Sequence, residues 1–216
     1  MIASERGIRM RIVKTARRLV ALGLSPATSG NLSARSKGGY LITPSGAAYE
    51  SLGPDDIVFM GDDWTHSGGQ KPPSSEWRLH RDIYRTRAEA GGVVHVHSTA
   101  ATALACLRRS IPPFHYEVAF AGGRDIRCSE YATFGTQELS AAAAKALEGR
   151  RACLLANHGA ITFAETVEDA ALLAERVENL ARLYLTTLPV SEPVLLDDAE
   201  MARVVAKFRA YGKPQA

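Results

Sequence analysis

Apolar positions along the chain follow two periods, one typical of helices and one typical of strands. Near the start, Ile8, Ile12, Leu19 and Leu22 fall on one face of an amphipathic helix that Gly23 would end. Polar, glycine-rich or proline-rich stretches at 26–33 and 62–73 are expected to be loops. The pattern predicts further helices at 74–90, 99–107, 134–149, 166–187 and 197–210, and strands at 39–46, 56–60, 93–98, 117–122, 125–131 and twice within 152–164.

The order of these elements predicts an α/β fold. Strands and helices interleave, which favours helices packed in layers on a sheet. Some neighbouring strands have no helix between them, so the sheet is expected to be mixed and largely antiparallel. A chain of 216 residues has the length of one domain, 1–216, and the expected architecture is a single-domain three-layer α/β/α fold.

Composition and charge narrow the class of protein. Basic and acidic residues nearly cancel, 26 against 23, so the net charge of +3 is a weak argument for a nucleic-acid partner. No uninterrupted apolar stretch approaches the length of a membrane span, and the Arg-rich N-terminus lacks the apolar region of a signal peptide. Cys106, Cys128 and Cys153 are isolated in the sequence, which favours a reducing, cytoplasmic setting.

Two histidines stand at alternate positions in the apolar run VVHVHS, residues 93–98. In a strand, His95 and His97 would point to one face while Val94 and Val96 pack on the other. Imidazole nitrogen is a good ligand for Zn²⁺, and three protein ligands with one open position are typical of a catalytic site. The pair alone fits buried structural histidines better than a metal site, but His158, in an NHG turn, offers a third ligand.

The other three histidines are weaker candidates. His66 lies in a polar loop and should be solvated, and His115 follows two prolines, where a surface or an interface is expected. His80 is four residues after Glu76, a spacing that could hold a metal. We expect the simpler arrangement, a Glu–His pair on a half-exposed helix face.

Three turns of small residues offer hydroxyls and free backbone amides. They are TSGN at 28–31, TPSG at 43–46, and Ser74-Ser75 at the start of a predicted helix. A helix N-terminus with serine hydroxyls can bind a phosphate, although an ordinary serine cap with Glu76 in the first turn is the better interpretation of that segment taken alone. None of the three turns has the sequence of a P-loop.

Short motifs along the chain together resemble those of the class II aldolase and adducin family: SGN, LITPSG, PSSEW, HVHS, YATFGT, NHG and LYLTTL. The resemblance extends from the first helix to KFRAYG and is greatest to members acting on L-fuculose 1-phosphate and 5-deoxyketose 1-phosphates. It implies a homotetrameric, zinc-dependent aldehyde-lyase with sites between subunits. Such an enzyme takes a phosphorylated sugar and reversibly releases dihydroxyacetone phosphate and a small aldehyde such as lactaldehyde.

The resemblance also implies roles for individual residues. His95, His97 and His158 would bind one Zn²⁺ per chain, and Glu76, which can also reach the metal, would be the catalytic acid/base. Two further catalytic residues would be Tyr116, reaching a neighbouring subunit, and Tyr211, in a C-terminal tail (about 205–216) that closes over the substrate.

Phosphate and apolar contacts are implied in the same way. For Phe134 and Phe208, which match substrate-lining positions, plain core packing is an equally good interpretation. The implied phosphate-binding residues are Thr28, Gly30, Asn31, Ser45, Gly46, Ser74 and Ser75.

Other functions on the same scaffold stay open at this point. Asn157 stands where the nearest aldolases have a histidine, and the motifs NHG and HVHS also occur in members with other substrates. A pentulose-5-phosphate 4-epimerase and a 3-oxo-4-phospho-acid decarboxylase are the enzyme alternatives. A non-catalytic adducin-like interaction domain is disfavoured because the three histidines and Glu76 are all present. The lysines lie in polar contexts unsuited to a Schiff base, which favours the metal route.

Overall fold

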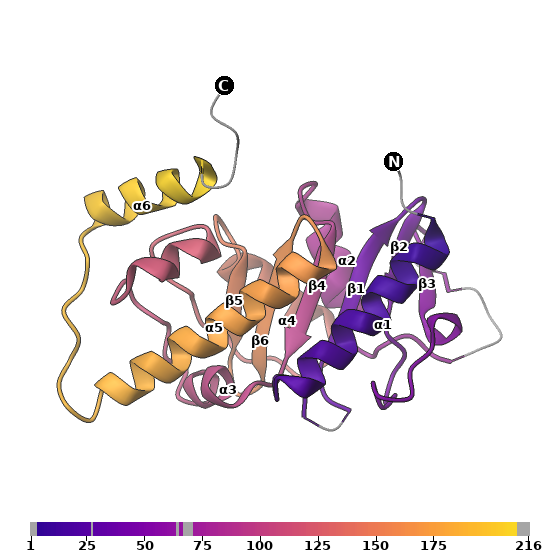
Figure 1. Ribbon diagram of the computed structural model, residues 1–216, viewed down its shortest axis with the longest axis horizontal. Helices are drawn as coiled ribbons and strands as arrows, with labels where there is room; N and C mark the ends of the chain where they lie inside the picture. Colours follow the sequence, from indigo (N-terminus) through magenta and orange to yellow (C-terminus); the bar gives the residue numbers. More distant parts are fainter. Residues whose placement is uncertain (1–3, 27, 64, 67–70, 211–216) are drawn as a thin grey trace.

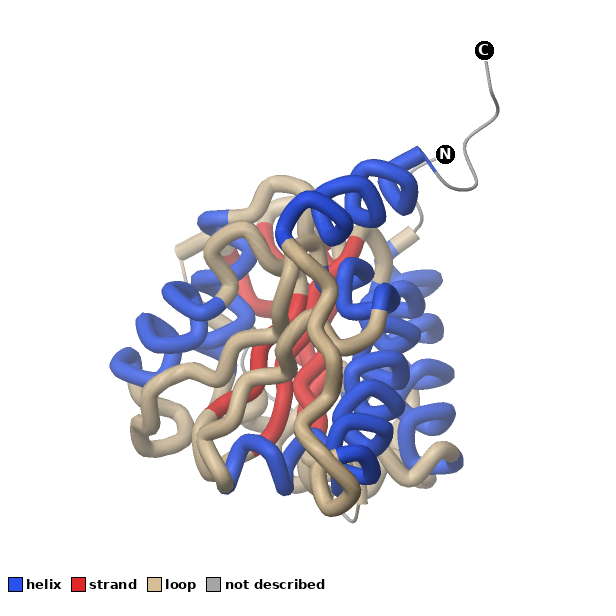
Figure 2. Tube along the Cα trace, turned by 90° about the vertical axis from the view of Figure 1, so that its left-hand side faces the viewer, coloured by secondary structure: helices blue, strands red, loops and turns tan. Residues whose placement is uncertain are grey.

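A six-stranded sheet lies at the centre of the protein, between helices on both of its faces (Figure 2). The structure is a computed structural model that describes residues 4–26, 28–63, 65–66 and 71–210. Among these residues, no helix combines the length and apolar character needed to cross a membrane. The helices and strands are α1 (Glu5–Ala21), β1 (Asn31–Ser36), β2 (Gly39–Ile42), η1 (Pro54–Asp56), β3 (Val58–Gly61), α2 (Trp77–Thr86), β4 (Gly92–Val96), α3 (Thr99–Cys106), η2 (Tyr116–Ala121), α4 (Gln137–Ala146), β5 (Ala152–Leu155), β6 (Gly159–Ala164), α5 (Val167–Thr187) and α6 (Asp198–Ala210).

The strands are ordered β3-β2-β1-β4-β6-β5, and every neighbouring pair is antiparallel. A mixed sheet was expected, but in the described part of the chain parallel pairing is limited to an isolated bridge between Cys128 and Leu154. Strand β4 occupies an inner position, flanked by β1 and β6. Its side chains are therefore covered on both faces of the sheet.

Two apolar cores fill the spaces between the sheet and the two helix layers. On one face, α1, α3 and α5 bury residues such as Leu19, Leu104 and Val177 against the strands. On the other, α2 and α4 bury Leu79 and Leu139. Figure 1 shows α1 and α5 crossing in front of the sheet, with α2 and α4 behind it. The predicted α/β/α layers and all six predicted helices are confirmed, although α2 begins at Trp77, after the predicted start.

The valine and histidine positions of β4 separate as their spacing predicts. Val94 and Val96 belong to the core under α1, α3 and α5. Val93 belongs to the opposite core, under α2 and α4. Since side chains two apart share a face, His95 points with Val93 toward the α2 side. The strand thus uses one face for the main core and presents His95 on the other.

Three segments differ from their prediction. Residues 117–122 are not a strand but the 3₁₀ helix η2, which ends at Gly122 with φ at 92°. Residues 125–131 are not a continuous strand: they form isolated bridges, Ile126 to Ile111 and Cys128 to Leu154 of the edge strand β5. Residues 31–33, predicted as loop, begin β1, where the polar Asn31 and Ser33 alternate with Leu32 and Ala34 in the core.

Candidate metal centre

Three imidazoles converge at one end of the sheet. His95 lies in β4, His97 follows that strand, and His158 directly precedes β6, the neighbouring strand. Their ligand nitrogens all lie within 4.8 Å of one another. The ring centroids are 4.7 to 4.9 Å apart, and each pair of rings meets edge to face. The three residues of the HxH pair and the NHG turn therefore form one cluster.

Two glycines allow the backbone to pack this closely around the cluster. A Cβ on Gly159 would lie 2.4 Å from the Val96 carbonyl oxygen and 3.0 Å from Cδ2 of His97. A Cβ on Gly30 would lie 2.6 Å from the carbonyl oxygen of His95, and Gly30 has φ at 82°. Larger residues at these two positions would displace β4 or the imidazoles.

The imidazole nitrogens are prepared as ligands. His95 Nδ1 donates to the Ala160 carbonyl oxygen at 3.0 Å, which directs Nε2 into the cluster. Burial, together with the neighbouring histidines, lowers the pKa of His97 and of His158 to about 4. His97 and His158 are therefore neutral at physiological pH, the form in which imidazole binds a metal.

Glu76 faces the cluster from the N-terminus of α2. Its Oε2 lies 3.2 Å from His95 Nε2, and its Oε1 lies 3.5 Å from His158 Nε2. Burial raises the pKa of Glu76, but the nearby His95, then His158 and the Asn31 amide, outweigh burial and hold the pKa well below 4.5. The Glu76 side chain is thus a buried, ionised carboxylate.

The donor set fits a divalent cation. His97 Nε2 lies 2.9 Å from His95 Nε2, and the buried Glu76 Oε1 has no hydrogen-bond partner among the described residues. Nitrogen and carboxylate oxygen atoms that face one another this closely need a positive charge between them. Three imidazoles with a neighbouring carboxylate are a common set for a catalytic Zn²⁺, with one position left for a substrate.

A buried carboxylate holds the segment after His97. Glu178, in α5, is 3% exposed and accepts hydrogen bonds from the backbone N–H groups of Ala100 and Ala101, each at 2.9 Å. These amides open α3, so the negative charge sits at the positive end of that helix. Helix α5 thereby fixes the turn that carries His97.

A pocket of about 380 Å³ opens beside the cluster. Hydrogen bonds from Ser45 N to Pro72 O and from Ser74 N to Thr43 O join the TPSG turn to the Ser74-Ser75 turn on one wall. The pocket brings together all the residues expected to bind phosphate with much of the expected metal and catalytic set: Thr28, Gly30, Asn31, Ser45, Gly46, Ser74, Ser75, Glu76, His97, Phe134 and His158.

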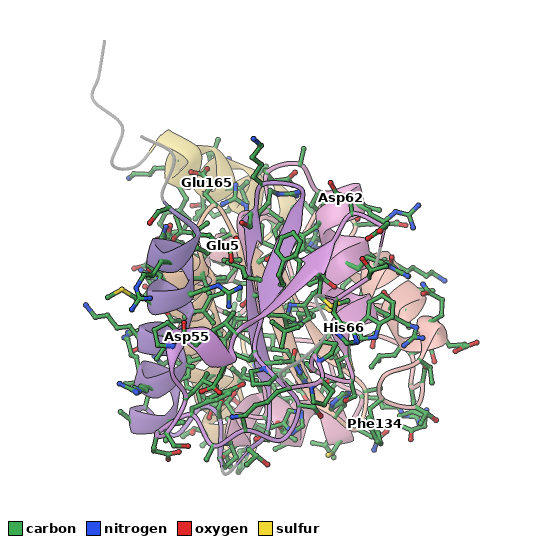
Figure 3. All side chains as sticks on the ribbon, turned by 90° about the vertical axis from the view of Figure 1, so that its right-hand side faces the viewer. Glu5, Asp55, Asp62, His66, Phe134 and Glu165 are labelled. Carbon is green, nitrogen blue, oxygen red and sulfur yellow. The ribbon has the colours of Figure 1, made fainter. Side chains whose placement is uncertain are left out.

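Other residues also line this pocket. Phe134 is 65% exposed and projects from the edge of the molecule (Figure 3), so core packing does not explain it. Tyr131, Ala132 and Asn157 line the pocket as well but were given no role from the sequence. Tyr131 and Ala132 belong to the motif YATFGT. This motif indicated that the segment lies at the site, but it did not indicate which of its residues besides Phe134 line the pocket.

Tyr116 and Phe208 lie apart from the pocket. Tyr116, in η2, is 49% exposed and stacks against Phe208 of α6 at a centroid distance of 6.1 Å. Phe208 in turn stacks on Phe120 at 3.9 Å. In Figure 1, α6 lies at the top of the molecule, whereas α3, which directly follows the histidine strand, lies at its lower edge. Tyr211 lies outside the described residues.

The expectation for His80 is wrong. This side chain is not half-exposed but fully buried, and it contacts Asn31 and Ser33, not Glu76. His66, labelled in Figure 3, is exposed as expected. The described lysines, Lys14, Lys37, Lys71, Lys145 and Lys207, are all exposed, which argues against a desolvated Schiff-base lysine among them.

Comparisons with known proteins agree with this site. Residues 10–185 match the family described as the class II aldolase and adducin N-terminal domain. The chain is 50% identical over 212 residues to a 5-methylthioribulose-1-phosphate/5-deoxyribulose-1-phosphate aldolase of Rhodospirillum rubrum, covering 98% of this chain and 96% of that protein. It is 48% identical over 203 residues to an L-fuculose phosphate aldolase of Escherichia coli, covering 94% of each.

Solved structures give the same result. A structure of L-fuculose 1-phosphate aldolase superposes with a TM-score of 0.91 at 41% identity, covering 96% of this chain and 98% of that chain. Fold, family model and relatives agree over nearly the whole chain. The chain belongs to the class II aldolase and adducin family, and within it to the metal-dependent aldehyde-lyases.

Proposed function

We propose that the protein is a Zn²⁺-dependent aldolase that reversibly cleaves a ketose 1-phosphate to dihydroxyacetone phosphate and a small aldehyde such as lactaldehyde. The substrate would be L-fuculose 1-phosphate or a related 5-deoxyketose 1-phosphate. The observation that carries this proposal is the pocket itself, which joins a histidine and carboxylate cluster to three hydroxyl-bearing turns. The names of the relatives support it, since each is a ketose-1-phosphate aldolase.

The metal would be held by His95, His97 and His158, with Glu76 able to join them. Cleaving a carbon–carbon bond beside a carbonyl leaves a negatively charged enediolate, and a bound Zn²⁺ supplies a Lewis acid next to that charge. These ligands would leave the cation fully charged, because imidazole binds a metal in its neutral form.

Glu76 is the proposed acid/base. Its carboxylate is ionised, buried to 6% exposure and open to the pocket, so it can take or return a proton at the carbon that becomes the enediolate. Tyr116, supplied by a neighbouring subunit, would handle the proton on the hydroxyl of the departing aldehyde. Tyr211 would close over the substrate, and Phe134 with Phe208 would contact its apolar part.

The hydroxyl-bearing turns would hold the phosphate. Ser45, Ser74 and Ser75 lie on the two hydrogen-bonded turns and line the pocket together with Thr28 and Gly30. Binding at this distant group positions the reacting carbons beside Glu76. We further propose a homotetramer in the cytoplasm, which the exposed Tyr116 and the three free cysteines support.

The test is a panel of ketose 1-phosphates and ketulose 5-phosphates, with products identified by mass. We expect dihydroxyacetone phosphate from a ketose 1-phosphate, about one Zn²⁺ per chain, loss of activity on chelation and recovery on adding Zn²⁺. An epimerised pentulose 5-phosphate, or carbon dioxide from a 3-oxo-4-phospho acid, would replace the proposal by one of the enzyme alternatives. Full activity in metal-free protein would refute the proposed site.

A further inference from the structure

A row of buried polar side chains runs from Glu76 into the layer between the sheet and α2. Asn31 Nδ2 lies 2.9 Å from Glu76 Oε2, and Asn31 Oδ1 lies 2.5 Å from His80 Nε2. His80 Nδ1 lies 2.6 Å from Ser33 Oγ, which lies 2.8 Å from the Tyr84 hydroxyl. All five residues are at most 8% exposed. The chemistry proposed for the pocket uses only Glu76 and Asn31 of this row.

The direction of every hydrogen bond in the row follows from the way the Asn31 amide lies. Asn31 donates its NH₂ group to Glu76 Oε2 and so presents its oxygen to His80. His80 must then carry its proton on Nε2 and accept at Nδ1 from the Ser33 hydroxyl. Ser33, having donated, accepts from Tyr84. All four donors therefore point toward Glu76, an arrangement in which each hydrogen bond strengthens the next.

The row also makes the two oxygens of Glu76 different. Oε2 is held by Asn31 and lies beside His95, whereas Oε1 has no hydrogen bond among the described residues. Burial lowers the pKa of His80 to about 3, so the ring stays neutral and keeps its single Nε2 proton. Without His80, the Asn31 amide could turn over or rotate away, and Oε2 would lose its fixed donor.

We propose that His80 is a positioning residue for Glu76: it locks the Asn31 amide so that Oε2 is held and Oε1 is the oxygen offered to the substrate proton. Ser33 and Tyr84 complete the row behind His80, at its Nδ1. This inference rests on the proposed role of Glu76 as acid/base. It gives a function to a histidine that makes no contact with the metal cluster or the pocket surface.

Two substitutions of His80, by glutamine and by asparagine, introduce the same amide group on side chains of different length. In His80→Gln the side-chain NH₂ can occupy the place of Nε2 and donate to Asn31, whereas in His80→Asn it is too short. We expect His80→Gln to keep a kcat close to that of the unchanged chain, and His80→Asn to lose about 10- to 100-fold. The KM for the sugar phosphate and the bound zinc should change little in either variant. Tyr84→Phe, which removes the far end of the row, should have a smaller effect than His80→Asn.

If His80 had only a structural role, kcat would not be higher in His80→Gln than in His80→Asn. Equal kcat in folded His80→Gln and His80→Asn would overturn the proposal, as would a loss confined to KM or to zinc content. Thermal melting of both variants identifies a folding defect. If neither His80 variant folds, Ser33→Ala and Tyr84→Phe test the proposal in their place. Unchanged kcat in both of these variants would also overturn the proposal.

A second readout does not depend on activity. Neutron diffraction from a crystal of the zinc-loaded protein should show deuterium on His80 Nε2 and none on Nδ1. A proton on Nδ1, or on both nitrogens, would overturn the inferred direction of the row. If the protein cleaves no ketose 1-phosphate, the proposed function fails, while the neutron map still decides whether the row is built as described.

Discussion

Glu76 combines burial with an ionised carboxylate, and its surroundings explain how. A carboxylate at 6% exposure would ordinarily have a raised pKa, but His95 and the Asn31 amide stabilise the charged form here. The binding of a cation at the imidazoles would stabilise it further. The residue is thus prepared as a base and not as a buried neutral acid.

Replacing Glu76 by glutamine tests this role at the scale of one residue. Glu76→Gln keeps the shape and can still accept from Asn31, so zinc content and phosphate binding should persist, while kcat falls by about 10²- to 10⁴-fold because no base remains. Metal analysis, inorganic phosphate titration and steady-state kinetics measure these three effects. Glu175→Gln, on the partly exposed surface of α5, serves as the control. A Glu76→Gln enzyme with normal kcat would remove Glu76 from the mechanism.

At the scale of single elements, strand β4 was predictable from the sequence and strand β1 was not. The alternate spacing of His95 and His97 predicted that the two side chains share a face, because a strand puts alternate residues on one side. Their role as metal ligands with His158 came from the resemblance to the family and not from the spacing. The strand at 31–36 was missed because Asn31 and Ser33 look like loop residues, yet both serve the polar row behind Glu76. The same tertiary contacts made His80 unpredictable, since its partners lie on a strand 45 or more residues earlier. Local sequence rules fail most often at such functional positions.

Helices α2 and α4 are joined by one carboxylate. Asp82 accepts hydrogen bonds from the Gln137 side chain at 2.6 Å and from the Ser140 hydroxyl at 2.8 Å, both on α4. Burial raises the pKa of Asp82, but the hydrogen bond from Arg81 and those from α4 outweigh it, so the pKa lies below the ordinary 3.8. The contact fixes α2, whose N-terminus carries Glu76, against the layer beside it.

This contact predicts a pH-dependent stability. Because the folded-state pKa is lowered, the charged Asp82 stabilises the fold above pH 3.8, and this contribution is lost as the pH falls through the lowered pKa. At pH 7, Asp82→Asn should cost about 1–3 kcal/mol of unfolding free energy. Below the lowered pKa the variant and the unchanged chain should converge. Urea unfolding at fixed protein and zinc concentration measures the difference, with the exposed Asp55→Asn as control. A pH-independent difference would contradict this account.

At the scale of the whole molecule, the layers were predictable and some connections were not. The helices have amphipathic patterns, and α1 and α4 begin after the capping residues Ser4 and Thr136, which are residue types typical of helix N-termini. The short apolar segment EVAFAG was predicted to be a strand but forms most of η2, which packs against α5 and α6. Helix η2 begins at Tyr116, which lies beside Phe208 and away from the pocket of its own chain. The separation fits a tyrosine that serves a neighbouring copy.

Subunit mixing tests that arrangement. If each site takes Glu76 from one chain and Tyr116 from the next, Glu76→Gln and Tyr116→Phe are each inactive alone but complement each other when subunits are exchanged. In a cyclic oligomer assembled at random from equal amounts, about a quarter of the sites would combine both unchanged residues. Mixed and refolded or co-expressed variants should therefore recover activity toward that fraction, whereas Glu76→Gln mixed with His97→Ala should recover none, because both changes lie on the same side of the site. If Glu76→Gln and Tyr116→Phe fail to complement although mass spectrometry shows mixed oligomers, Tyr116 does not act in a neighbouring site. Restored turnover would instead show that η2, remote from the metal centre in one chain, completes the site of another.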